Sequence, residues 1–123
     1  MKILLVEDEE VLARVLQEKL ESENFEVFVA RDGAVVLSMT KKIKPDLILL
    51  DIMLPKLDGL EVLSALKAED ELKPIPVIML SNLDEDNKIK RSLEMGAVDY
   101  LIKAQHPINE VVEKINDYIL KSK

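Results

Sequence analysis

The sequence contains no cysteine, and this absence excludes several kinds of chemistry at once. A chain of 123 residues without a thiol has no disulfide, no thiolate nucleophile and no zinc site built on cysteine. The single histidine, His106, argues against a site in which several imidazoles bind a metal. Tryptophan is absent and only 3% of the residues are aromatic, so we expect no stacking platform for bases or for a flavin.

Long apolar runs and an excess of basic residues are also missing. The longest apolar runs are about five residues, whereas a membrane-spanning helix needs about 20. No small-residue cleavage pattern follows Met1, so we expect no signal peptide and a cytoplasmic location. A formal net charge of −7 disfavours direct contact with nucleic acid or with an anionic membrane.

Strand-like and helix-like patterns alternate along the chain, which at 48% hydrophobic content we expect to form one domain over residues 1–123. Short apolar runs predict strands, and apolar residues spaced three and four apart predict helices. The predicted strands cover residues 3–6, 26–30, 47–50, 77–80 and 100–102. The predicted helices cover residues 12–20, 33–42, 58–66, 84–95 and 108–119.

Five strand–helix units of about 25 residues predict an α/β protein with a doubly wound, five-stranded parallel sheet. The strands at 3–6, 47–50 and 77–80 are apolar throughout, which indicates burial on both faces. The strand at 26–30 alternates more and is placed at an edge. We expect the strand order 2-1-3-4-5, in which the first and third strands are neighbours.

Acidic residues follow two of these neighbouring strands. The apolar run "LILL" leads directly into Asp51, and the first strand is followed by Glu7 and Asp8. An unpaired buried carboxylate costs several kcal/mol, and two carboxylates about 4 Å apart repel by roughly 4 kcal/mol at an effective dielectric constant near 20. A positive charge must therefore offset this cluster.

Two sources of positive charge fit the cluster. A divalent cation such as Mg²⁺ prefers oxygen ligands and tolerates one or two carboxylates with water. A lysine is the other candidate, and Lys103 follows the fifth strand, while Ser81 adds a hydroxyl after the fourth. Because the carboxyl ends of parallel strands share one edge of the sheet, these groups predict a single site.

Four segments resemble the receiver domain of two-component response regulators. They are "LLVEDEE", "LLDIMLPKLDG", "VIMLSN" and "GAVDYLIK", in the order and at the spacing of that family. The resemblance covers the whole chain and implies a flavodoxin-like (βα)5 receiver fold. It implies that Asp51 is modified, by accepting a phosphoryl group from the phosphohistidine of a sensor histidine kinase or phosphotransfer protein.

The resemblance also assigns supporting roles. It implies Mg²⁺ held by Glu7, Asp8, Asp51 and the backbone carbonyl of Met53, with Lys103 and Ser81 contacting the phosphoryl group. The domain would catalyse its own phosphorylation and dephosphorylation, and would have no separate enzymatic output.

A conformational switch is implied as well. Ser81 and Tyr100 are its expected switch residues, and the fourth helix, fifth strand and fifth helix form its responding face. This face would control a downstream protein or an output domain, and would support a phosphorylation-dependent dimer. The chain stops just after the fifth predicted helix. This is compatible both with a stand-alone regulator and with a receiver domain cut from a longer regulator.

Three other functions compete with this interpretation. A haloacid dehalogenase-type phosphatase needs a second acid two residues after its nucleophile, where this chain has Met53. A flavin-binding protein needs a glycine- and hydroxyl-rich phosphate loop after the first strand, where "VEDEEV" is acidic. The alternative that stays open is a receiver-fold interaction module that works without phosphorylation.

The sequence departs from the family pattern at several positions. Glu7 stands where many receivers have aspartate, and Lys103 is followed by Ala104 instead of proline, so we expect a trans Lys103–Ala104 bond. His106 is expected to be an exposed loop residue. The fourth helix offers little beyond Ile89 and Leu93 for anchoring, which predicts a weakly held element.

Overall fold

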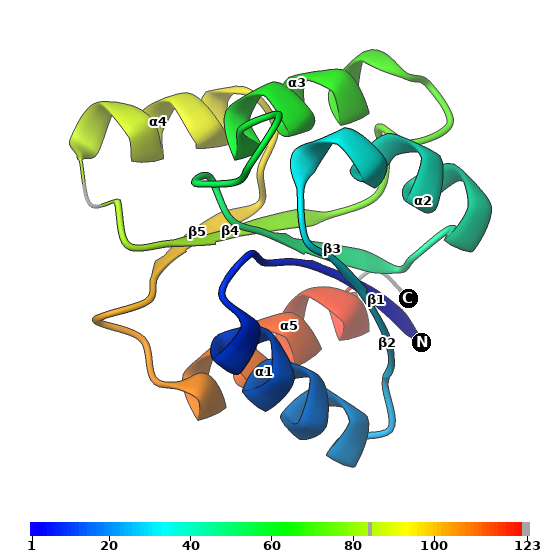
Figure 1. Ribbon diagram of the computed structural model, residues 1–123, viewed down its shortest axis with the longest axis vertical. Coiled ribbons are helices and arrows are strands. Elements are labelled where there is room, and N and C mark those ends of the chain that lie inside the picture. The colour runs from blue at the N-terminus through cyan, green and yellow to red at the C-terminus, as the bar shows by residue number, and fades with distance from the viewer. Residues whose placement is uncertain (84, 122–123) are drawn as a thin grey trace.

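A five-stranded parallel sheet forms the centre of the computed structural model, which describes residues 1–83 and 85–121 (Figure 1). Its strands lie in the order β2-β1-β3-β4-β5, which confirms the predicted order and the edge position of the second strand. The strands are β1 (Lys2–Val6), β2 (Glu26–Ala30), β3 (Leu47–Leu50), β4 (Val77–Ser81) and β5 (Asp99–Ile102).

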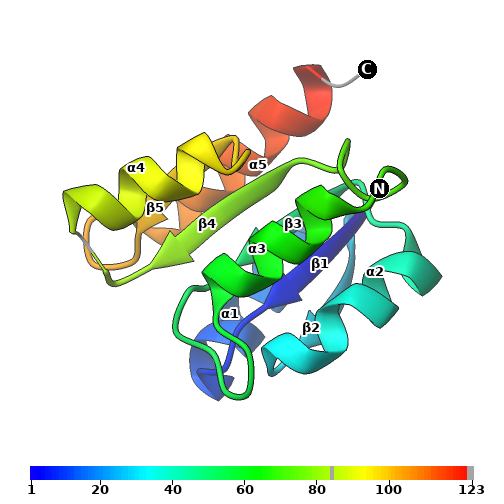
Figure 2. The ribbon, with the colours of Figure 1, turned by 90° about the horizontal axis from the view of Figure 1, so that it is seen from above.

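Helices cover both faces of the sheet. They are α1 (Glu10–Ser22), α2 (Val36–Ile43) after a 3-10 turn η1 (Gly33–Val35), α3 (Gly59–Ala68), α4 (Asp86–Glu94) and α5 (Ile108–Lys121). In Figure 1, α2, α3 and α4 lie above the sheet, and α1 and α5 lie below it. Seen from above, α2 lies toward β2 and α4 lies toward β5 (Figure 2). Among the described helices, none has the length and apolar character needed to cross a membrane.

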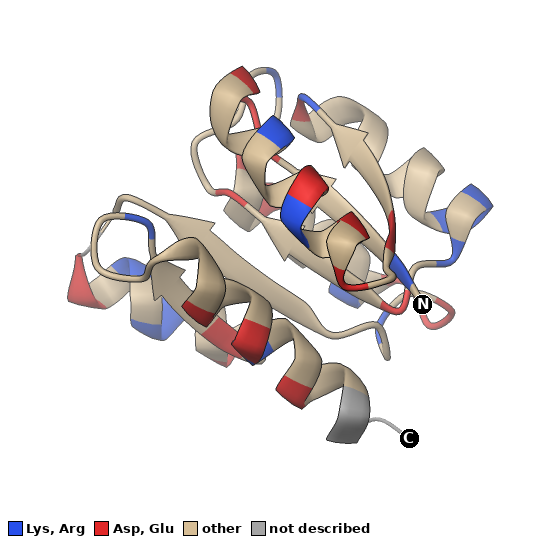
Figure 3. Cartoon of the chain, turned by 90° about the horizontal axis from the view of Figure 1, so that it is seen from below, with Lys and Arg blue, Asp and Glu red and all other residues tan. Residues whose placement is uncertain are grey.

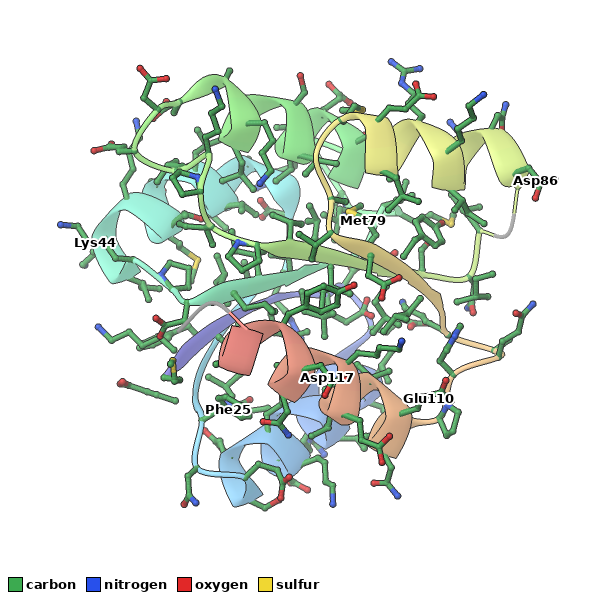
Figure 4. All side chains as sticks on the ribbon, turned by 180° about the vertical axis from the view of Figure 1, so that it is seen from behind. Phe25, Lys44, Met79, Asp86, Glu110 and Asp117 are labelled. Atoms are coloured by element: carbon green, nitrogen blue, oxygen red, sulfur yellow. The ribbon has the colours of Figure 1, made fainter. Side chains whose placement is uncertain are left out.

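Two hydrophobic layers sandwich the sheet because successive strand side chains point to opposite faces. In β1, Ile3 and Leu5 pack toward α1 and α5, whereas Leu4 and Val6 pack toward α2 and α3. Figure 4 places Met79 in the layer on the side of α3 and α4. All four residues of β3 are buried, as the continuous apolar run predicts. Charged residues lie mainly on helices and loops, outside these layers (Figure 3).

The turn from β3 into α3 is tightly folded against the end of the strand. The Asp58 carboxylate accepts a hydrogen bond from the Glu61 backbone N–H at 3.0 Å and thereby caps the start of α3. The backbone N–H of Gly59 donates to the carbonyl oxygen of Ile52 at 2.7 Å. A Cβ atom at Gly59 would overlap the backbone carbonyl of Asp51, so the close approach requires glycine.

Helix α4 is the least buried of the helices that flank β5. Ser92 is its buried residue among those described, and Leu93 is 44% exposed, which agrees with the prediction that few apolar residues anchor this helix. Gly96 directly follows Met95, the C-cap residue of this helix, and its φ of +110° suits glycine. Among its described side chains, helix α5 in contrast buries the apolar groups of Val111, Val112, Ile115 and Ile119.

The tight approach at Gly59 leads to a stability prediction. Gly59→Ala should lower the free energy of unfolding by about 1–3 kcal/mol or more, because the added methyl group meets backbone atoms that must move. Urea denaturation of the variant would measure this loss. Ser64→Ala, at an exposed position of the same helix, should change the stability by less than about 0.5 kcal/mol. Equal stability of the two variants would contradict the close approach.

The burial difference leads to a second prediction. Backbone amides of α4 should exchange with deuterium faster than those of α5, because local opening of α4 exposes few apolar side chains. Hydrogen–deuterium exchange of the unmodified domain, followed by mass spectrometry or NMR, would measure this. Equal protection of the two helices would show that burial does not set their local stability.

Candidate functional site

The register of the sheet brings Glu7 and Asp51 together. Val6 pairs with Leu50, so the residues that follow these two strands emerge side by side at the carboxyl edge, on the left of Figure 1. The backbone N–H of Asp51 donates to the carbonyl oxygen of Val6 at 3.1 Å, which continues the β1–β3 pairing by one residue. Both carboxylates are buried, with Glu7 1% and Asp51 5% exposed.

Lys103 supplies the positive charge that this pair of acids requires. It follows β5, and its side chain crosses the end of β4 to reach the acids after β1 and β3. Its Nζ atom lies 2.8 Å from Asp51 Oδ2 and 2.6 Å from Glu7 Oε1. A third carboxylate, Glu9, also contacts it, with Oε2 at 2.9 Å. One ammonium group therefore contacts three carboxylates.

Burial and charge shift the ionisation of this cluster. Burial raises the pKa of Glu7 to about 7; the hydrogen bond from Lys103 opposes the shift and the negative charge of Asp51 adds to it. Burial by itself would lower the pKa of Lys103, but the hydrogen bonds to Asp51, Glu7 and Glu9 outweigh it and raise that pKa above its usual value. Lys103 is therefore charged at any physiological pH.

A cavity of about 220 Å³ opens beside the cluster. It is lined by Asp8, Glu9, Asp51, Met53, Ser81, Asn82 and Lys103. Glu7 lies behind this lining, because its Oε1 accepts from Lys103 and its Oε2 accepts from the backbone N–H groups of Asp8, at 2.9 Å, and Glu9. The cavity is thus bounded by two acids from the first loop, the Asp51 carboxylate, a hydroxyl and an ammonium group.

The donor set of this cavity suits a hard divalent cation. Asp8 and Asp51 line it with carboxylate side chains, and Met53 lines the same rim. One or two carboxylates completed by carbonyl oxygen and water are ligands that Mg²⁺ accepts. Within residues 1–83 and 85–121, no three Asp, Glu, His or Cys side chains are already grouped around a possible metal position. Two carboxylates on one rim fit a metal that takes its remaining ligands largely from water.

Two hydroxyl groups hold the segment that leaves β4. Ser81, which is fully buried, accepts a hydrogen bond from the backbone N–H of Leu83 at 3.4 Å. The Tyr100 hydroxyl donates to the carbonyl oxygen of the same residue, Leu83, at 2.6 Å. The two predicted switch residues therefore both bond to Leu83, Ser81 through its N–H and Tyr100 through its carbonyl group.

The structure also reveals two residues whose contacts the sequence did not predict. Glu9 was one acid in the run "EDEE", and nothing in that run indicates which members reach across the sheet. His106 was expected to be an exposed loop residue, and this is wrong: it is half-buried, with Nδ1 3.0 Å from the backbone nitrogen of Ile102. The imidazole closes the turn after Lys103, whose bond to Ala104 is trans as predicted.

The family model of the response regulator receiver domain matches residues 3–116 of this chain. The chain belongs to the response regulator receiver domain family. It is 40% identical over 121 residues to the alkaline phosphatase synthesis transcriptional regulatory protein PhoP of Bacillus subtilis (strain 168), a match that covers 98% of this chain and 49% of PhoP. The chain spans half or less of the length of the curated relatives it matches.

Solved receiver structures have the same fold. The BeF3-activated N-terminal receiver domain of Klebsiella pneumoniae RstA is 32% identical, with a TM-score of 0.89 over 97% of this chain and 98% of that chain. The Mn(2+)-bound form of the response regulator Rcp1 is 34% identical, with a TM-score of 0.79 over 89% of this chain and 85% of that chain. The flavodoxin-like receiver fold expected from sequence is thereby confirmed.

The raised pKa of Glu7 predicts how the stability of this receiver domain depends on pH. Between about 4.5 and about 7, folded Glu7 binds a proton that the unfolded chain releases, so the free energy of unfolding falls as pH rises. This contribution is fully present below pH 4.5 and is lost by about pH 7, and its size is on the order of 1–3 kcal/mol.

Denaturation of metal-free protein at pH 5 and pH 8 would test this prediction. The stability difference between these pH values should be smaller in Glu7→Gln by the amount given above, because glutamine does not titrate. Glu18→Gln, at an exposed position of α1, should keep the wild-type difference. An unchanged difference in Glu7→Gln would mean that Glu7 is already ionised at low pH.

Proposed function

We propose that this receiver domain accepts a phosphoryl group on Asp51 from the phosphohistidine of a sensor histidine kinase or phosphotransfer protein. The observation that carries the proposal is a carboxylate held at the bottom of a polar cavity by one ammonium group. Asp51 is 5% exposed, its Oδ2 is 2.8 Å from Lys103, and its Oδ1 accepts from the Met53 N–H at 3.2 Å. Such a carboxylate is paired with a positive charge and fixed in direction, which suits a nucleophile.

The chemistry is a direct transfer. An Asp51 oxygen forms a bond to phosphorus while the bond between phosphorus and the histidine nitrogen breaks, and the electron pair of that bond stays on the imidazole. Lys103 balances the negative charge on the phosphoryl oxygens, and positioning with charge neutralisation supplies most of the catalysis. Hydrolysis of the resulting acyl phosphate would return the domain to its resting state, so the domain catalyses reactions of its own side chain only.

We further propose that the metal is Mg²⁺. Asp8, Asp51 and the carbonyl of Met53 would hold it, with Glu7 as a more distant acid, and it would neutralise charge on the phosphoryl oxygens. The oxygen lining of the cavity supports this, as does the Mn(2+)-bound form of Rcp1. The BeF3-activated form of RstA supports the acceptor role, because beryllium fluoride resembles a phosphoryl group in shape and charge.

The shared anchor at Leu83 suggests how the signal leaves the site. If the Ser81 hydroxyl turns toward a phosphoryl oxygen, the Leu83 N–H loses its partner, while the Tyr100 hydroxyl still contacts the Leu83 carbonyl. The segment before α4 then changes position, and α4 has little buried surface to resist this change.

The responding face would be formed by α4, β5 and α5. We propose that it controls a downstream protein or an output domain, with dimerisation through α4 and α5 as one mode, in the cytoplasm. A receiver-fold interaction module that does not need phosphorylation is the competing function.

Labelling experiments separate these two functions. The wild-type domain should be labelled by acetyl phosphate and by a phosphorylated histidine kinase when Mg²⁺ is present, and EDTA should abolish the labelling. Asp51→Asn and Asp51→Ala should take up no label, because neither side chain can form an acyl phosphate. Asp70→Asn, which removes an exposed acid elsewhere, should be labelled like the wild type. Undiminished labelling of Asp51→Asn would reject Asp51 as the acceptor.

A further inference from the structure

Glu9 contacts the proposed phosphorylation site, and neither the family match nor the proposed reaction gives it a role. Its Oε2 lies 2.9 Å from Lys103 Nζ, and its side chain lines the same cavity as Asp51. Unlike Glu7 and Asp51, which are 2% and 6% exposed by side chain, Glu9 is 56% exposed. It is therefore the solvent-facing member of the cluster around Lys103.

The backbone around Glu9 indicates that its side chain is directed to Lys103 and not to its own helix. Glu9 occupies the N-cap position of α1, where a side chain commonly accepts a hydrogen bond from the first turn. The Glu9 carboxylate makes no such bond. Its hydrogen bond runs instead to Lys103, which is 94 residues away in the sequence.

The hydrogen-bonding capacity of Lys103 is filled in this arrangement. A lysine ammonium has three N–H donors and no acceptor. Carboxylate oxygens of Glu7, Glu9 and Asp51 lie 2.6, 2.9 and 2.8 Å from Nζ, so each donor has a partner. A phosphoryl oxygen that approaches Asp51 can bond to Lys103 only if one of these partners leaves.

Glu9 is the partner that leaves at least cost. Glu7 is held from behind by the backbone N–H groups of Asp8 and Glu9, and moving it would leave a buried carboxylate without a partner. Asp51 must stay in place because it is the attacking group. Glu9 loses only a partly exposed ion pair, and its carboxylate can turn to water.

We propose that Glu9 competes with the phosphoryl group for Lys103. Given the proposed function, Glu9 holds Lys103 in the resting domain, repels an incoming phosphoanion by its charge, and is displaced when the anion binds. Glu9 is thus a positioning residue that slows phosphoryl uptake and weakens the binding of phosphoryl-like anions.

The test measures two quantities at saturating Mg²⁺: the rate of Asp51 labelling by acetyl phosphate and the affinity for beryllium fluoride. Glu9→Gln and Glu9→Ala should each improve both by about two- to fivefold. At about 1.36 kcal/mol per factor of ten, this corresponds to about 0.4–1 kcal/mol, the range of partly exposed ion pairs. The gain should shrink in high salt, since screening weakens the competing ion pair, whereas a packing effect would not respond to salt.

Glu10→Gln is the matched control. Glu10 is the next residue along the chain, and its replacement by glutamine changes the net charge by the same amount. It is exposed, pairs with Arg14 and does not line the cavity beside Asp51. It should leave both quantities as in the wild type. The proposed competition would be overturned if Glu10→Gln raised the labelling rate and the beryllium fluoride affinity as much as Glu9→Gln does. It would also be overturned if the wild type were labelled and the Glu9 variants showed no increase in either quantity. A wild type that neither takes up label nor binds beryllium fluoride would instead overturn the proposed function.

Discussion

The site depends on one ammonium group shared among buried acids. Without Lys103, the carboxylates of Glu7 and Asp51 would lie next to each other in a region nearly closed to water, and their repulsion and desolvation would both oppose folding. With Lys103 in place, both buried carboxylates have a positively charged partner, while burial still raises the pKa of Glu7. The interaction that makes the acidic edge stable is also the one that fixes the direction of the Asp51 carboxylate.

The parallel sheet makes this arrangement possible. Strand pairing aligns Val6 with Leu50 and Ser81 with Ile102, so the residues that follow the strands arrive at one level. Lys103, from the edge strand β5, has a side chain long enough to cross the end of β4. The tight turn at Gly59 keeps the loop after Asp51 against the strand, and the Asp51 backbone N–H bonds to Val6 on the neighbouring strand. The backbone of Asp51 is therefore fixed both by β1 and by the loop that follows it.

The two faces of the sheet differ in how firmly they hold the helices next to β5. On one face α5 buries a row of apolar side chains, and on the other α4 contributes a single buried serine among its described residues. The contacts that tie the start of α4 to the site are hydrogen bonds at Leu83, from Ser81 and from Tyr100. Partly buried Ile89 and Met95 also pack against the core, so α4 is held by less buried surface than α5 and by polar contacts just before its start.

Periodicity and composition were sufficient to predict the elements and a parallel sheet, and with the strand order 2-1-3-4-5 they also predicted the edge at which Asp51, Glu7, Asp8, Ser81 and Lys103 gather. This works because strand and helix periods and the shared carboxyl edge of parallel strands are local or topological rules. The sequence could not indicate that Glu7 turns inward, that Glu9 reaches Lys103, or that His106 closes the turn after β5. Those outcomes depend on the distances between side chains that are remote in the chain, and only the packed structure determines which carboxylate comes within hydrogen-bonding distance of which donor.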